Sequence, residues 1–144
     1  MRLPLYRVEA VVLFTEPWGE QDRKVTLYSL EKGKIEVLAK GGRRMKSKLS
    51  PSIDPPTHGG FLLRRMRLQP DIIEETWIIN SFPWLRVNLF KLGYTFFFLE
   101  LVKKLSGEEA NPPLFKLLLS CFYWMEKIPL ENLPSLLLSF QILL

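Results

Sequence analysis

The amino-acid sequence predicts an α+β protein, in which a five-stranded β-barrel of the OB type precedes an all-α helical domain that is incomplete. Two observations predict this fold class. Residues 1–81 contain five short stretches rich in β-branched and aromatic residues, a pattern typical of a small closed β domain. Residues 82–144 contain longer apolar runs that follow helix-capping residues. We therefore expect an OB-fold domain over 1–81 and the N-terminal part of a helical domain over 82–144.

Five strands are expected in the first part of the chain. The first, 6–14, alternates and then becomes apolar, and the second, 23–30, is rich in β-branched and aromatic residues. The third, 34–40, alternates in part, and a short turn with glycine joins it to the second as a hairpin. The fourth and fifth candidates are 60–68 and 71–79. No convincing helix separates the first three, which favours a small closed or sandwiched β domain.

Helices are expected from Ser81 onward. Ser81 is the expected N-cap, with Pro83 in the first turn. Helices are expected over 89–105, which ends in two lysines, and over 114–126, which follows an Asn-Pro pair; a third starts at Asn132. They are apolar nearly all round and so need burial from several sides. Because the last apolar run reaches the final residue without a cap or polar tail, we expect the chain to be a fragment.

Composition excludes several classes of protein. Of the 144 residues 47% are apolar and 24% charged, a globular balance that excludes wholesale disorder. One cysteine and one histidine exclude an internal disulfide and a zinc site with four such ligands. The longest charge-free apolar stretch, 132–144, is shorter than the ~20 residues that span a bilayer, and the N-terminus lacks the apolar core of a signal peptide. We expect a cytoplasmic protein.

The net charge of +5 lies in one segment. Residues 37–53 contain no acid, and the rest of the chain has equal numbers of basic and acidic residues. Glycines and a following proline predict a loop after the third strand rather than a regular strand. Such a loop either is simply solvated or attracts a polyanion by releasing its counterions, and we favour the second reading. The basic residues are Lys40, Arg43, Arg44, Lys46 and Lys48.

Further candidates for nucleic-acid contact lie on the expected strands and loops. Alternation puts Arg65 and Arg67 on one face of the fourth strand, where they either extend the basic track or lie on a solvated edge. Trp18 lies between Pro and Gly in an expected loop, and either stacks on a base or partner or covers the barrel core. Tyr28 and Phe61 are expected in the core.

The sequence does not assemble an active site. The glycine-rich stretch after Lys40 fails the P-loop pattern at two positions, so ATP binding is not expected. His58 is expected as a surface turn residue without a partner acid, and Cys121 as a buried small apolar residue. Alternation places Glu74 and Glu75 on opposite faces, which argues against a paired-carboxylate site. We therefore do not expect an enzyme.

These residues in this order resemble the RecO family of bacterial recombination mediators and DNA repair proteins. The resemblance runs from about Tyr6 to Leu144, and its order and spacing are specific although no single motif is diagnostic. The stretches that carry it are 10–13 followed by 19–22, the basic stretch 39–47, and the helical stretches 81–86, 94–101 and 111–118.

The resemblance implies both a fold and a set of partners. It implies an OB domain, a helical domain, and ATP-independent binding and annealing of single- and double-stranded DNA. It also implies work with RecR and the single-stranded DNA-binding protein, which indirectly helps RecA onto DNA, in the cytoplasm at the nucleoid. Many RecO-like proteins carry a cysteine-rich zinc module later in the helical domain. This sequence shows none, so no cofactor is expected within it.

Two functions from different classes remain open. In the first, the basic loop, extended by Arg65 and Arg67, neutralises DNA phosphates without reading base identity. In the second, the chain is a protein-interaction scaffold, whose apolar helices hold a partner tail while the basic loop meets acidic residues on that tail. The first is preferred because of the charge distribution.

Overall fold

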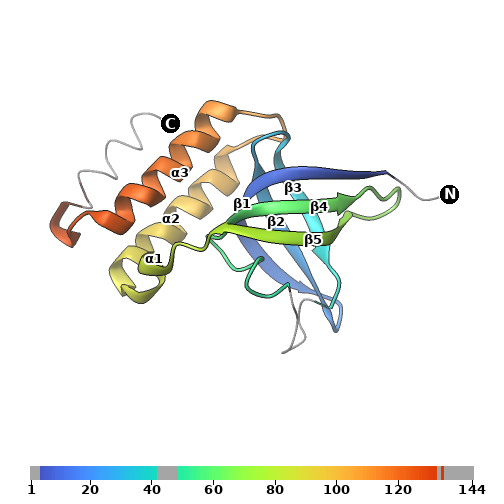
Figure 1. Cartoon of the computed structure of the whole chain (residues 1–144), viewed down its shortest axis with the longest axis horizontal. Helices are drawn as coiled ribbons and strands as arrows, with labels where there is room; N and C mark the ends of the chain where they lie inside the picture. The colour runs from blue at the N-terminus through green and yellow to red at the C-terminus, as the bar shows by residue number, and fades with distance from the viewer. Residues whose placement is uncertain (1–3, 42–48, 133, 135–144) are drawn as a thin grey trace.

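The computed structural model describes residues 4–41, 49–132 and 134, and its strands close into a barrel beside a layer of helices (Figure 1). Around the barrel the strand order is β1-β2-β3-β5-β4, and β4 pairs back to β1. This order confirms the predicted five-stranded OB-type barrel followed by helices. The strands are β1 Leu5–Trp18, β2 Asp22–Ser29, β3 Gly33–Ala39, β4 His58–Arg64 and β5 Asp71–Asn80.

The barrel closes through one short parallel contact. All other neighbouring strands are antiparallel, whereas β3 and β5 run parallel and pair only through Val37 with Asp71 and Leu38 with Ile72. In contrast, β1 pairs with β4 along its first half and with β2 along its second half. The change of partner in β1 coincides with a bulge near Leu13, which bends the strand around the barrel.

Two strand boundaries differ from those predicted. The first strand does not end at residue 14, because its later residues pair with β2 as far as Trp18. The fourth strand covers His58–Arg64, so Arg65 lies beyond its end. There the chain turns, and the carboxylate of Asp71 accepts a hydrogen bond from the backbone N–H of Met66 at 2.9 Å. The expected alternation of arginines on this strand therefore does not apply.

The barrel core follows the two-residue period of its strands. Val8, Ala10 and Val12 are buried and belong to one cluster in the interior, because successive side chains of a strand point to opposite faces. Phe61 is fully buried in the same cluster, as predicted. The other buried members are Val25, Leu27, Val37, Ala39, Ile53, Leu63 and Ile73.

The helices begin at asparagine caps. The side chain of Asn88 accepts hydrogen bonds from the N–H groups of Phe90 and Lys91, both at 3.1 Å, and Asn111 caps the next long helix in the same way. The predicted cap at Ser81 is wrong. Phe82 occupies that position with a φ of 54°, held by burial of its ring against Phe122. The helices are α1 Pro83–Val87, α2 Leu89–Leu105 and α3 Pro112–Lys127.

A short 3₁₀ turn, η1 (Leu130–Asn132), follows α3. The third helix that the sequence predicts from Asn132 onward falls on residues 133 and 135–144, which lie outside the described residues.

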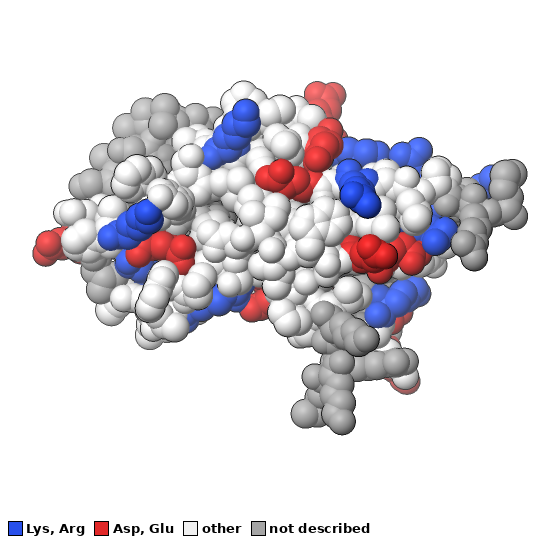
Figure 2. All heavy atoms as spheres, in the orientation of Figure 1, with Lys and Arg blue, Asp and Glu red and all other residues white. Residues whose placement is uncertain are grey.

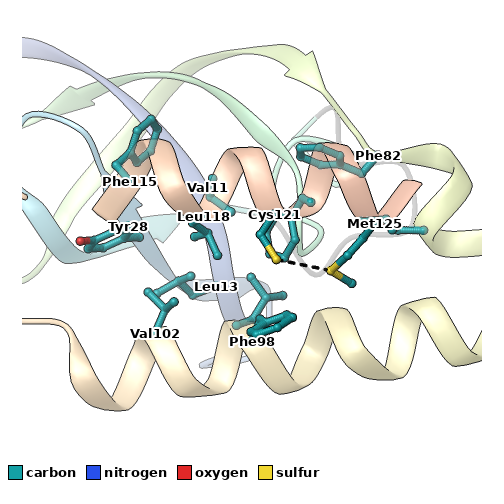
Figure 3. Packing of buried hydrophobic residues seen from close by; sticks show 13 residues of the cluster. Val11, Leu13, Tyr28, Phe82, Phe98, Val102, Phe115, Leu118, Cys121 and Met125 are labelled. Atoms are coloured by element: carbon teal, nitrogen blue, oxygen red, sulfur yellow. Dashed lines mark hydrogen bonds between the residues drawn. The ribbon is translucent and has the colours of Figure 1, made fainter. Parts of the chain in front are cut away.

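A second apolar cluster joins the barrel to the helices. Figure 3 shows Val11, Leu13 and Tyr28 of the barrel facing Phe98 of α2 and Phe115 of α3. These side chains point outward from β1 and β2, so α2 and α3 bury the outer surface of these strands as one layer. Tyr28 is therefore a core residue, as predicted.

The helices keep exposed apolar surface. None of the helices in the described residues is long and apolar enough to span a membrane. The large apolar side chains that remain exposed on them are Trp84, Val87, Leu89, Phe90, Phe96, Phe97, Leu105, Tyr123 and Trp124.

Cys121 is buried in the cluster between barrel and helices, and we expect it to be unreactive in the folded chain. Its side chain is 4% exposed, its Sγ lies 3.7 Å from Sδ of Met125, and burial raises the pKa of the thiol to about 12. At pH 8 the thiolate that reacts with disulfide reagents is therefore scarce. Absorbance after addition of such a reagent should rise slowly without denaturant and rapidly in urea. Rapid stoichiometric labelling of the folded chain would contradict this burial.

Candidate nucleic-acid interface

Of the basic segment, defined as residues 40–48, only the first two residues lie within the described part of the chain. Lys40 and Gly41 follow β3, whereas Arg43, Arg44, Lys46 and Lys48 lie outside the part of the chain that the structure describes. The carboxylate of Asp22 anchors this start, because one oxygen accepts from the N–H of Gly41 at 2.7 Å and the other lies 3.3 Å from Nζ of Lys40. Such an exposed ion pair contributes little free energy, so Lys40 can still exchange this partner for a phosphate.

The residues that lead from the basic segment to β4 are anchored by a helix. Arg86 of α1 forms an ion pair with Asp54, and its Nη2 donates to Oγ1 of Thr57 at 2.9 Å. Its Nε donates to the carbonyl of Ser81 at 2.7 Å, and the carbonyl of Thr57 accepts from Val12 of β1 at 2.9 Å. The segment is therefore tied to the barrel at one end, and to the barrel and α1 at the other.

Trp18 lies beside the start of the basic segment. It ends β1, directly opposite Asp22 in the β1–β2 ladder, and 43% of it is exposed. It is thus a strand residue at the surface and not a loop residue. Through Asp22, the structure brings Trp18 and Lys40 to one end of the barrel.

Sequence reasoning missed Lys24. Its Nζ lies 5.0 Å from the ring centroid of Trp18, 3.0 Å from a carboxylate oxygen of Glu16 and 3.7 Å from one of Glu36. The pKa of Lys24 is raised, chiefly by the hydrogen bond to Glu16. The ammonium therefore holds the indole in place on the outer surface. This partnership depends on β1 reaching residue 18, which the sequence pattern did not predict.

Arg65 and Arg67 lie elsewhere on the barrel. Both are exposed in the loop between β4 and β5, and the guanidinium of Arg65 lies 5.3 Å from the ring centroid of Tyr6. That loop follows Arg64, which pairs with the first residue of β1, whereas Trp18 is the last residue of that strand. The structure therefore does not bring the two arginines together with Trp18.

A pocket of about 760 Å³ lies between the barrel and the α2–α3 connection. Carboxylates outnumber ammonium groups in its lining by five to two, so it repels a polyanion. Figure 2 shows positive and negative side chains interspersed over the barrel in that view. The charged residues of the pocket are Glu31, Glu36, Asp71, Glu108, Glu109, Lys32 and Lys34.

His58 is not the solvated turn residue that the sequence predicted. It begins β4, is buried, and its Nε2 lies 2.7 Å from a carboxylate oxygen of Glu9 on β1. Its ring also contacts the edge of Phe115, with centroids 5.9 Å apart. The contact between His58 and Phe115 joins the barrel to α3. In the described residues no group of three or more His, Cys, Asp or Glu side chains could hold a metal ion.

Two family models match the chain. "Recombination protein O N terminal" matches residues 1–82, and "Recombination protein O C terminal" matches residues 86–144. The chain belongs to the RecO family. A protein from Pelotomaculum thermopropionicum named DNA repair protein RecO is 39% identical over 118 residues, which are 81% of this chain and 46% of that protein. Its namesake from Bacillus mycoides is 33% identical over 120 residues, which are 83% of this chain and 48% of that protein.

This RecO-family chain spans about half the length of the curated relatives it matches. The N-terminal RecO model covers all five strands and the basic segment, and the C-terminal model covers α2 and α3. The matched family is named for recombination, and the matched relatives are named for DNA repair.

Proposed function

We propose that this RecO-family chain binds single- and double-stranded DNA through the end of the barrel at which the basic segment starts. One observation carries the proposal: the whole net charge of +5 lies in residues 37–53, and the rest of the chain sums to zero. The basic residues of this stretch begin with Lys40, at the same end of the barrel as the exposed Trp18. Basic side chains release counterions from phosphates, and an exposed aromatic ring accepts an unpaired base. Arg65 and Arg67 contact DNA only if it also reaches the opposite end of β1.

DNA bound in this way can anneal without ATP. Lysine and arginine side chains screen the repulsion between the phosphates of two strands, and base pairing then supplies the driving force. Within recombinational repair, we propose that the chain acts with RecR and the single-stranded DNA-binding protein and so indirectly promotes loading of RecA. We further propose that it is cytoplasmic, is not an enzyme and needs no cofactor of its own.

Neutralising two arginines of the basic segment should weaken DNA binding. If about four phosphates of a single strand are neutralised, log K falls against log salt with a slope near −3, at about 0.7 per contact. The variant Arg43→Gln/Arg44→Gln should bind oligo-dT more weakly, with a slope near −1.5. Fluorescence anisotropy of labelled oligo-dT between 50 and about 300 mM salt measures both quantities.

The matched control is Lys104→Gln/Lys116→Gln, which removes the same charge from exposed positions on α2 and α3. It should leave the slope near −3, since the number of phosphates that the protein neutralises, and not its net charge, sets that slope. Equal affinities and slopes for the wild type and the arginine variant would refute the role given to the basic segment.

The second candidate function is a scaffold for a partner tail, favoured by the exposed apolar side chains of α1 and α2. Trp84 and Phe90 are about two-thirds exposed. A partner peptide with acidic residues and an apolar end suits both these helices and the basic segment. Competition between oligo-dT and such a peptide discriminates the two functions, because a scaffold binds the peptide but not the oligonucleotide.

A further inference from the structure

Three strands of the barrel build an exposed aromatic platform around Trp77. Its indole extends from β5 over Gly60 of β4, where a Cβ would overlap the ring atoms Cε2, Cζ2 and Nε1. The guanidinium of Arg7, on β1, lies 5.7 Å from the ring centroid. Only glycine at position 60 leaves room for this ring, so backbone and cation together hold it in place.

This platform does not serve the barrel core. Trp77 is 43% exposed, as much as Trp18. Leu5, which alternation places on the same outer face as Arg7, is also about half exposed. The barrel therefore holds a large flat ring at its surface. Arg7 lies in the part of β1 that pairs with β4, whereas Trp18 lies in the part that pairs with β2.

The charges near Trp77 nearly cancel. Arg64 and Glu74 form an ion pair, and the exposed Glu75 lies in the same row of the barrel as Arg7, since both pair with Leu62 of β4. A ligand that is held only by phosphate charge gains little on such a face. A ligand with an exposed planar ring gains stacking on the indole and contact with the guanidinium.

We propose that Trp77 and Arg7 form a stacking site for an unpaired nucleobase, separate from the basic segment; this inference rests on the proposed DNA binding. Bases in a duplex already stack on their neighbours, so the site accepts single strands only. Arg7 and Trp18 lie eleven residues apart on β1, toward opposite ends of a strand that bends around the barrel. The barrel thus offers single-stranded DNA two aromatic contacts that are well separated.

The test compares Trp77→Leu with Trp84→Leu, which removes an exposed indole from α1. Trp77→Leu should weaken binding of oligo-dT about tenfold, with the same salt slope and the same affinity for a duplex of equal length. Trp84→Leu should bind both DNAs like the wild type. Unchanged affinity of Trp77→Leu for oligo-dT would overturn the inference, and so would equal losses for oligo-dT and the duplex.

Gly60→Ala supplies a second test that retains the indole. The new methyl group pushes the ring off β4, so Gly60→Ala should also bind oligo-dT more weakly than the wild type.

A fluorescence experiment tests the site independently of these variants. The triple variant Trp18→Phe/Trp84→Phe/Trp124→Phe leaves Trp77 as the sole emitting tryptophan. Saturating oligo-dT should quench its fluorescence, and unchanged emission would also overturn the inference.

The failures of the two proposals are distinguishable. If Arg43→Gln/Arg44→Gln weakens DNA binding and Trp77→Leu does not, the stacking site is wrong and the proposed function stands. If neither variant weakens binding, both proposals are wrong.

Discussion

Phe115→Ala should lower the free energy of unfolding by about 3–5 kcal/mol, the usual loss when a buried phenylalanine is truncated. Phe115 is 1% exposed where barrel and helices meet, with ring centroids 6.3 Å from Tyr28 and 5.9 Å from His58. Truncation removes dispersion contacts on both sides and leaves a cavity between two rigid layers. Urea denaturation followed by tryptophan fluorescence measures the change.

Phe90→Ala is the matched control, because it removes the same side chain from the surface of α2, where Phe90 is 68% exposed. Its free energy of unfolding should stay within about 0.5 kcal/mol of wild type. Similar losses for both variants would mean that Phe115 is not packed between barrel and helices.

Gly33→Ala should cost about 2–5 kcal/mol of stability. Gly33 has a φ of +71°, where alanine pays about 1–2 kcal/mol. Its Cβ would also overlap the backbone carbonyl of Glu109, in the connection between α2 and α3, and relieving such overlap costs about 1–3 kcal/mol. The neighbouring Lys34 ties the same connection to β3, since its N–H donates to the carbonyl of Gly107 at 3.1 Å.

Gly19→Ala separates the two contributions. Gly19 has nearly the same φ, +68°, but a Cβ there would meet nothing within 4 Å. Its loss should therefore be about 1–2 kcal/mol, the conformational cost alone. The change in the unfolded chain is the same for both variants and cancels in the comparison. Equal losses, again from urea denaturation, would show that the α2–α3 connection does not restrict position 33.

Local patterns predicted most of the fold. Alternation and turn glycines identified five strands, and two terminal lysines marked the end of α2 at Leu105. The missed boundaries depend on non-local pairing. Thr15, Glu16 and Pro17 break the apolar pattern of the first strand, yet they extend it because β2 lies alongside. A single sequence does not reveal a partner that lies on another strand.

The candidate site was predicted by charge but not by geometry. Clustering of lysine and arginine is visible in the sequence, as is an aromatic residue in an unusual setting. The partnership of Lys24 with Trp18 needs the register between β1 and β2, and that of His58 with Glu9 joins residues 49 positions apart. The separation of Arg65 from Trp18 likewise follows from how β1 winds around the barrel.

The contacts of Arg86 have a consequence for measuring how DNA affinity varies with salt. Only a quarter of the side chain of Arg86 is exposed. Two of its acceptors, the Ser81 carbonyl and the Thr57 hydroxyl, are uncharged, so dissolved ions hardly attenuate those bonds. Raising the salt concentration should therefore weaken phosphate binding well before it breaks the bond between Arg86 and Thr57.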